Sequence, residues 1–288
     1  MRSLLVVALF TSFYLQVGGC AGGSPVTTTG GQDAKRYTDR GNELQKNGDI
    51  DGAISEYKAA LRLDPDHILA HYNLGNALQK KGDLEGANAE FQNVLRLDPN
   101  DTDAHYNLGR VLKAKGNLEG AITEYQSTLR LSPSHLGAHL NLGPALDAKG
   151  DREGAIEALQ AAVRLYPNHD RAHYNLGRAF MAKGDLDRAI GEFQTALRLI
   201  PSTVVHNELG NALRAKGDLE GATAEFQTAL RLDPSYMLAH YNLGSVYQAQ
   251  GRRAEARTEY IEALRLIPDT PSDPGWIEKL EQLLRELE

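Results

Sequence analysis

The chain has 288 residues, 28 of them glycine and only one cysteine, and a formal net charge of −7 at pH 7. At 41% hydrophobic residues it is too apolar to be disordered throughout. The single cysteine excludes an intrachain disulfide framework and a zinc site built from several cysteines. The acidic balance argues against a general nucleic-acid binder, which carries a basic excess. What remains is a folded protein whose high glycine content needs an explanation.

The first 19 residues have the pattern of an export signal. Met1-Arg2 provides a positive start, an apolar run covers residues 4–15, and Gly18-Gly19 stand directly before Cys20. The run is shorter than the ~20 residues that cross a bilayer as a helix. We therefore expect residues 1–19 to be a signal peptide that is cleaved. The glycines and Cys20 resemble the lipobox of bacterial lipoproteins, in which the cysteine is lipidated.

That resemblance implies an exported protein held at a membrane by a lipid on Cys20. Ala21 stands where an aspartate would retain a lipoprotein at the inner membrane of enteric bacteria. We therefore expect the outer membrane, with the protein facing the periplasm. Residues 20–33 would comprise the lipidated cysteine and a flexible tether, because they are rich in Gly, Thr and Ser and lack apolar periodicity.

From residue 34 onward the sequence repeats one unit. The pentapeptide HYNLG begins at His71, His105, His173 and His240, and HLNLG begins at His139. The glycine of this motif recurs at spacings of 34 residues, with a single spacing of 33. A second glycine, an alanine, an apolar residue and a closing proline follow in the same order in seven copies. Because period, order and residue type agree, the pattern resembles the tetratricopeptide repeat over residues 34–270.

The resemblance implies an all-α, right-handed solenoid of seven helix pairs, with units at residues 34–67, 68–101, 102–135, 136–169, 170–202, 203–236 and 237–270. In the second unit, Gly82 can take the left-handed conformation that ends the first helix, and Asp83 can cap the second. Pro99 then ends that second helix. Since one unit cannot bury its own apolar face, stacking supplies the core. Five glycines in the first turn of the second helix, such as Gly86, have no explanation from the sequence.

Two units depart from the pattern. The sixth is one residue short around Val205-His206-Asn207, which predicts a small rotation of that unit. Pro144 lies inside the first helix of the fourth unit, where it removes one backbone hydrogen bond and predicts a kink. Both departures are expected to change the superhelix locally.

The repeat ends after Pro268, and residues 271–288 predict one more helix. Asp273 and Pro274 suit its N-cap and its first position. An apolar stripe follows at helical spacing, formed by Trp276, Leu280, Leu283, Leu284 and Leu287. We expect a capping helix, because an open solenoid end exposes apolar surface. A dimerisation helix is the alternative reading of the stripe, although we expect a monomer.

In this repeat family the first helix of each unit lines the concave face, where ligands lie as extended peptides. One tyrosine and one asparagine recur there, and the repeated amides can bond peptide backbone. This row of asparagines, one in most units, resembles the asparagine ladder of O-linked N-acetylglucosamine transferase. The alternative is that asparagine is simply common at this position in the family and has no binding role. The candidate groove residues are Tyr72, Asn73, Asn76, Tyr106, Asn107, Arg110, Asn141, Tyr174, Asn175, Arg178, Asn211, Tyr241 and Asn242.

The inner positions carry more basic than acidic side chains. The basic residues are Lys35, Lys46, Lys80, Arg110, Lys113, Arg171, Arg178 and Arg214, and the acidic residues are Asp39, Asp103, Asp147 and Glu208. Such a groove favours neutral or acidic segments of a partner. The carboxylate clamp that binds chaperone C-termini is not matched, because its lysine positions hold other residues.

Neither a metal site nor an active site is predicted. His67/His71, His135/His139 and His169/His173 are spaced four apart, but the first of each pair falls in a loop and no third ligand is apparent. No signature surrounds a nucleophile, and no glycine-rich loop follows a strand. We therefore expect a protein that is not an enzyme and binds no cofactor.

Together these features predict a protein–protein interaction scaffold at the bacterial cell envelope. It would bind an extended peptide or partner protein in the concave groove and assist assembly of an envelope, secretion or pilus complex. The alternative is a glycan- or synthase-binding subunit of a polysaccharide-secretion machine. The expected partners are a protein and, through Cys20, a membrane, but no nucleic acid.

Overall fold

The computed structural model describes residues 29–267 and 275–288, and every regular element in these two ranges is a helix. The first eight are α1 (Thr29–Lys46), α2 (Ile50–Leu63), α3 (Ile68–Lys81), α4 (Leu84–Leu97), α5 (Thr102–Ala114), α6 (Leu118–Leu131), α7 (Leu136–Ala148) and α8 (Arg152–Leu165). The others are α9 (Asp170–Lys183), α10 (Leu186–Leu199), α11 (Thr203–Lys216), α12 (Leu219–Leu232), α13 (Met237–Ala249), α14 (Arg253–Arg265) and α15 (Gly275–Glu286).

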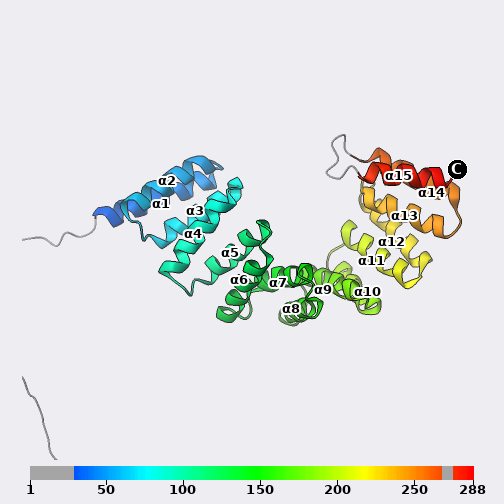
Figure 1. Ribbon diagram of the computed structural model, residues 1–288, viewed down its shortest axis with the longest axis horizontal. Coiled ribbons are helices and arrows are strands. Elements are labelled where there is room, and N and C mark those ends of the chain that lie inside the picture. The colour runs from blue at the N-terminus through cyan, green and yellow to red at the C-terminus, as the bar shows by residue number, and fades with distance from the viewer. Residues whose placement is uncertain (1–28, 268–274) are drawn as a thin grey trace, which may run out of the picture.

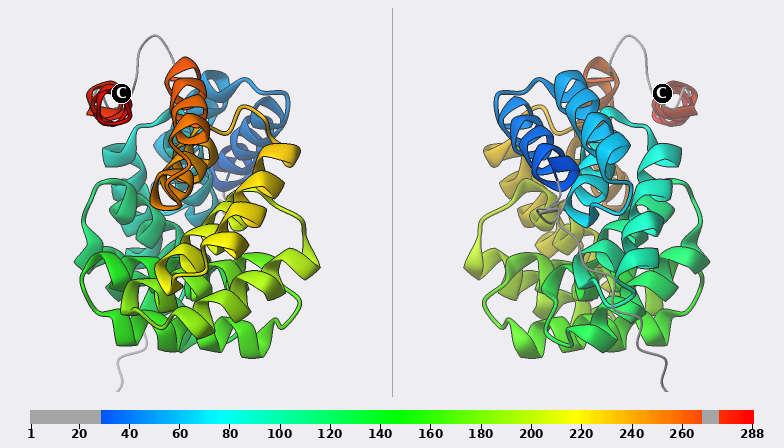
Figure 2. Two further views of the ribbon diagram at one scale, coloured as in Figure 1. Left: turned by 90° about the vertical axis from the view of Figure 1, so that its right-hand side faces the viewer. Right: turned by 90° about the vertical axis from the view of Figure 1, so that its left-hand side faces the viewer.

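The helices stack into an arc. Each odd-numbered helix packs on the even-numbered helix that follows it, and consecutive odd-numbered helices from α1 to α13 also touch one another. Consecutive odd-numbered helices touch because they lie on the inside of the curve, as the middle helices α5 to α11 show (Figure 1). End-on views place the middle units at the bottom and both ends of the solenoid above them (Figure 2). The all-α, right-handed solenoid predicted from the sequence is confirmed.

Glycines of two kinds shape each unit as expected. Gly82 has a φ of +87° at the end of α3, and the six glycines that follow the corresponding helices also have positive φ. Gly75 lies against the ring of Phe91, so close that a Cβ on Gly75 would stand 3.0 Å from two ring carbons. The first kind ends the inner helix, and the second lets inner and outer helices approach closely.

The structure also explains the glycines in the first turn of the outer helices. The N–H of Gly86 donates to Oδ1 of the capping Asp83 at 2.9 Å, and a Cβ on Gly86 would stand 2.7 Å from Oδ2. In the fifth unit Arg188 replaces the glycine, and its N–H lies farther from Asp185, at 3.2 Å. In these outer helices the capping carboxylate therefore occupies the space that a Cβ would take. The same contact recurs at Gly52, Gly120, Gly154 and Gly221.

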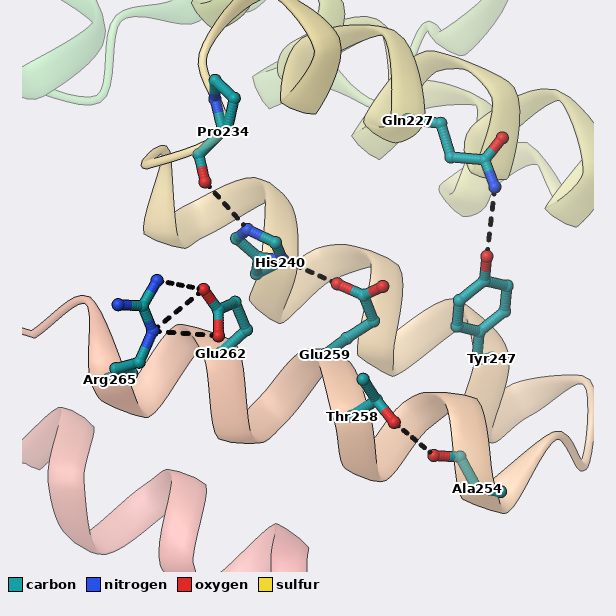
Figure 3. Close-up of polar contacts among 9 residues, drawn as sticks. All are labelled: Gln227, Pro234, His240, Tyr247, Ala254, Thr258, Glu259, Glu262 and Arg265. Atoms are coloured by element: carbon teal, nitrogen blue, oxygen red, sulfur yellow. Dashed lines mark hydrogen bonds and ion pairs between the residues drawn. The ribbon is translucent and has the colours of Figure 1, made fainter.

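The repeated histidine joins three parts of its unit. Nδ1 of His240 lies 2.6 Å from Oε2 of Glu259 on the outer helix, and Nε2 lies 3.1 Å from the carbonyl of Pro234 in the preceding loop (Figure 3). His71, His105 and His173 make the same two contacts. Both partners are oxygen acceptors, so a fully bonded ring carries a proton on each nitrogen.

The two irregular units keep the helical stack. α7 runs through Pro144 as one helix, although proline leaves the carbonyl of Leu140 without its usual intrahelical donor. The amide Nδ2 of Asn175, from the next unit, lies 3.5 Å from that carbonyl oxygen. In the shortened sixth unit, His206 keeps its 2.6 Å contact with the carboxylate of Glu225.

The two ends differ in how they relate to the sequence prediction. α1 begins at Thr29, so residues 29–33, placed in the tether, are helical; Asp33 lies inside α1 and pairs with Arg36 at 3.1 Å. The predicted signal peptide, Cys20, Pro268 and the predicted N-cap at Asp273-Pro274 lie outside the described residues. At the other end α15 packs on α14, with Leu280 fully buried. Within the described ranges, no helix is long and apolar enough to cross a bilayer.

Candidate functional site

Four tyrosines form a row on the inner helices. Tyr72, Tyr106, Tyr174 and Tyr241 are half-buried, and each ring packs on the aromatic residue of its own outer helix at centroid distances of 5.9–6.2 Å. Burial raises the pKa of Tyr72, an effect that the side chains of Asn76 and Asn107 oppose. The four tyrosines are therefore part core and part groove surface.

The asparagine ladder connects neighbouring units. Nδ2 of Asn107 donates to the hydroxyl of Tyr72 at 2.9 Å, and Nδ2 of Asn141 donates to the hydroxyl of Tyr106 at 3.2 Å. Asn73 and Asn242 donate in the same way to asparagine side chains of the preceding unit. One amide N–H of each of these four asparagines thus holds two units together. Nδ2 of Asn141 also donates to the carbonyl of Gly137 at 2.8 Å, and a ligand could use only the amide atoms that remain.

Unpaired positive charge gathers in the middle of the groove. Arg110, Lys113, Arg171 and Arg178 have no carboxylate within 4.0 Å among the described residues. Burial lowers the pKa of Lys113, and the positive charge of Arg171 lowers it further. Cations of the third and fifth units therefore repel each other across the groove. By contrast, Lys81, Lys115, Lys149, Lys183 and Lys216 each pair with a carboxylate of the preceding outer helix.

The groove contains a small pocket at the fourth unit. It has a volume of about 170 Å³ and lies between α7 and α9, where Pro144 and Gly143 face Asn175, Arg178 and Ala179. The sequence singled out Asn175 and Arg178 but treated Pro144 only as a helix irregularity. The sequence did contain a sign of the pocket, because proline replaces the arginine found at the same position in the third and fifth units.

A larger cavity of about 660 Å³ lies at the C-terminal end of the groove. Its walls include Glu208, Asn211 and Arg214 from α11, Tyr241 and Asn242 from α13, and Trp276 from α15. Trp276 meets Tyr241 edge-on at 5.0 Å, and Nζ of Lys279 lies over both rings at 4.5 and 4.9 Å.

Glu208 is an acid at a ladder position that is asparagine in the second to fifth units and in the seventh. Burial raises its pKa, whereas Arg178, Asn207 and Asn211 oppose the shift. Sequence reasoning placed Trp276 only in the cap, although it stands 34 residues after Asn242 and so continues the ladder register. The C-terminal end of the groove thus differs in charge and in aromatic content from its centre.

Comparison with family profiles identifies the repeat. Profiles described as tetratricopeptide repeat match residues 72–135, 140–202 and 237–270, and one described as TPR repeat matches residues 41–82 and 210–251. The chain belongs to the tetratricopeptide repeat family. Tetratricopeptide repeat proteins are generally scaffolds without catalytic activity. In the described part of this chain, no three His, Cys, Asp or Glu residues are grouped so as to hold a metal ion.

Solved tetratricopeptide repeat structures share this architecture. The chain is 30% identical to MamA, with a TM-score of 0.56 over 59% of this chain and 92% of that one. It is 25% identical to YrrB, described as having an unusual peptide-binding site, with a TM-score of 0.55 over 64% of this chain and 95% of that one. A tetratricopeptide repeat protein from Parabacteroides merdae has a TM-score of 0.69 at 17% identity, over 89% of this chain and 99% of that one. No curated protein matches the sequence.

Proposed function

We propose that this protein is an interaction scaffold whose concave groove holds an extended, acidic segment of a partner protein. The observation that carries the proposal is the set of unpaired cations at the centre of the groove, Arg110, Lys113, Arg171 and Arg178. A positive cluster that forms no ion pair within 4.0 Å, in a protein of net charge −7, favours an anionic ligand. It also lowers the affinity for basic segments.

The groove surface suits a peptide. Half-buried tyrosines offer flat apolar contact at a low cost in side-chain entropy, and the free amide groups of the ladder can bond main-chain N–H and C=O groups. Arg110 and Arg178 lie 5.9 Å from the ring centroids of Tyr106 and Tyr174, so each cation stands beside an aromatic surface. The peptide-binding site described for YrrB supports the same use of a related fold.

Photo-crosslinking tests whether the groove is occupied. A crosslinking residue placed at Ala148 or Ala215, both of which line the groove, should capture a partner protein in cells. The matched controls place it at Arg130 or Arg164, which are exposed on the outer helices α6 and α8. Adducts from the outer positions alone, or from none, would contradict the proposal.

Charge reversal tests why the partner binds. The double variant Arg110→Glu/Arg178→Glu should weaken partner binding at least tenfold without changing helical content. Arg130→Glu/Arg164→Glu alters the net charge equally on the outer face and should leave binding unchanged. Equal loss in both pairs would show that total charge, rather than the groove, governs binding.

We also propose that the protein acts at the cell envelope, anchored by a lipid on Cys20 in the outer membrane and facing the periplasm. The support is the order of positive start, apolar run, paired glycines and cysteine in residues 1–20. Cys20→Ser should release the protein from the membrane fraction and remove the acyl mass. A serine variant that fractionates like the parent protein would refute the anchor while leaving the groove proposal intact.

A further inference from the structure

The fourth unit interrupts the side-chain rows of the groove. Leu140 stands where the third and fifth units have Tyr106 and Tyr174, and Pro144 stands where they have Arg110 and Arg178. Two large polar side chains are therefore missing from the wall at the centre of the arc. The 170 Å³ pocket occupies this place, with Arg178 in its wall and the other three unpaired cations on the adjoining inner helices α5 and α9.

The floor of the pocket is apolar and its rim is polar. Leu159 is 1% exposed and Ala179 is 5% exposed, and they lie with Pro144 beneath the opening. Asp147 and Arg178 stand at the rim. A volume of this size is close to the ~150 Å³ of an apolar cavity that holds benzene. The pocket thus has room for one branched aliphatic side chain.

Two contacts keep the pocket open. A Cβ on Gly143 would stand 2.5 Å from Cγ of Leu159, so glycine holds the inner helix against the floor. Nδ2 of Asn175 lies 3.5 Å from the carbonyl oxygen of Leu140, which Pro144 leaves free. The next unit thereby satisfies the acceptor that the proline exposes, and α7 keeps its helical path through the pocket wall.

We infer that this pocket anchors one compact aliphatic side chain, leucine, isoleucine or valine, of the bound segment, and so sets its register along the groove. The inference rests on the proposed function, because the cations on both sides of the pocket are what select the acidic residues that flank the anchor. Arg110 and Lys113 lie on the N-terminal side, and Arg171 and Arg178 lie on the C-terminal side. The ligand class is an acidic extended segment with one central aliphatic residue.

Two labelled nonapeptides test the anchor. Both contain only Glu, Ser and Gly around the central position, which is Leu in one and Gly in the other. Fluorescence anisotropy should show that the protein binds the Leu peptide about tenfold more tightly, which corresponds to ~1.4 kcal/mol.

The decisive variant is Pro144→Asn, which introduces the residue found at the same position in the second and sixth units, Asn76 and Asn211. It restores a backbone donor and fills the pocket without adding charge, so loss of folding is not a concern. The preference for Leu over Gly should fall to near onefold, while affinity for the Gly peptide stays unchanged. Gly191→Ala on the outer helix α10, where a Cβ meets nothing within 4 Å, is the control and should keep the tenfold preference.

An equal affinity of the parent protein for both peptides, or an undiminished preference in Pro144→Asn, overturns the anchor. If the groove crosslinks to a partner in cells but neither acidic peptide binds, the anchor is wrong and the scaffold proposal stands. If the groove also fails to crosslink, both are wrong. Tenfold preference in the parent and its loss in Pro144→Asn establish the anchor.

Discussion

His139 offers a direct test of how the repeated histidine stabilises its unit. Nε2 of His139 lies 2.9 Å from the carbonyl oxygen of Pro133, as in other units, but Nδ1 is buried without a hydrogen-bond partner. The reason is Ala158, which stands 19 residues later, where five other units have the glutamate that meets the ring. We predict that Ala158→Glu stabilises the protein at pH 6.

The expected gain follows from two opposing contributions. A buried polar atom without a partner costs roughly 1–3 kcal/mol, and a hydrogen bond to a charged group contributes about 1.5–3 kcal/mol. Burying the new carboxylate and ordering its side chain oppose this gain. The five existing glutamates keep 19–25% of their side-chain surface exposed, so their desolvation is partial. We expect a net stabilisation of about 1 kcal/mol, or ~2 °C in Tm for a chain of this length.

The pH dependence identifies the source of the gain. A carboxylate partner favours the protonated ring, so the gain should be largest near pH 6 and should fall by pH 8.5, as the ring loses its proton. Ala158→Gln is the control, because its amide can bond the neutral ring and gives a gain that does not depend on pH in this range. Both variants are measured by urea unfolding followed by circular dichroism.

Three results would refute this reasoning. Ala158→Glu could destabilise the protein at pH 6, its gain could be equal at pH 6 and pH 8.5, or the glutamine and glutamate variants could show the same pH profile. The first result would mean that burial of the carboxylate outweighs the hydrogen bond. Either of the others would mean that the ring is not protonated when it meets a carboxylate.

Three further predictions concern the helix contacts, the cap and the intact histidine pair. Gly177→Ala should cost about 1–3 kcal/mol of unfolding free energy, because its Cβ would stand 2.7 Å from a ring carbon of Phe193, whereas Gly191→Ala meets nothing within 4 Å and should be neutral or stabilising. Removal of residues 275–288 should lower Tm and promote aggregation, seen by light scattering, because it exposes the apolar surface of the last pair. Burial alone would lower the pKa of His240, but hydrogen bonds to Glu259 and Pro234 and the charges of Glu259 and Glu262 raise it overall from 6.5. The pair's contribution to stability should therefore be complete below pH 6.5 and decline as the pH rises through the folded-state pKa. An NMR titration of the ring measures that pKa, and Glu259→Gln should lower it.

The sequence could predict the helices because their signals are local. Gly82 ends α3 and Asp83 caps α4 within two adjacent residues, and the same pair of signals recurs with the period of the repeat. The glycine in the first turn of the outer helix, such as Gly86, could not be explained from the sequence. A Cβ on Gly86 would stand 2.7 Å from Oδ2 of Asp83, and such a distance appears only once the turn is built.

The groove was less predictable than the fold, because its polar atoms bond across units. The position of Asn107 on the inner face followed from the repeat register, but its 2.9 Å bond to Tyr72 depends on how far one unit is rotated against the last. Likewise, the pocket at Pro144 forms only because Leu140 and Pro144 together replace the tyrosine and the arginine of the neighbouring units. Charge was easier to predict, since it needs only the face of the helix and no exact distance.

Substitution of the ladder asparagines is a poor test of ligand binding, because these side chains also hold the units together. Variants that change the charge of the groove or the shape of its pocket are better tests. Asn107 uses its Nδ2 on Tyr72 and its Oδ1 on Arg110, so Asn107→Ala removes two structural hydrogen bonds as well as any ligand contact. Each such bond contributes about 0.5–1.5 kcal/mol to stability. Loss of binding in an asparagine-to-alanine variant would therefore be expected even if no ligand touched the ladder. Arg110→Glu/Arg178→Glu avoids most of this ambiguity, because both guanidinium groups are exposed and neither pairs with a described carboxylate.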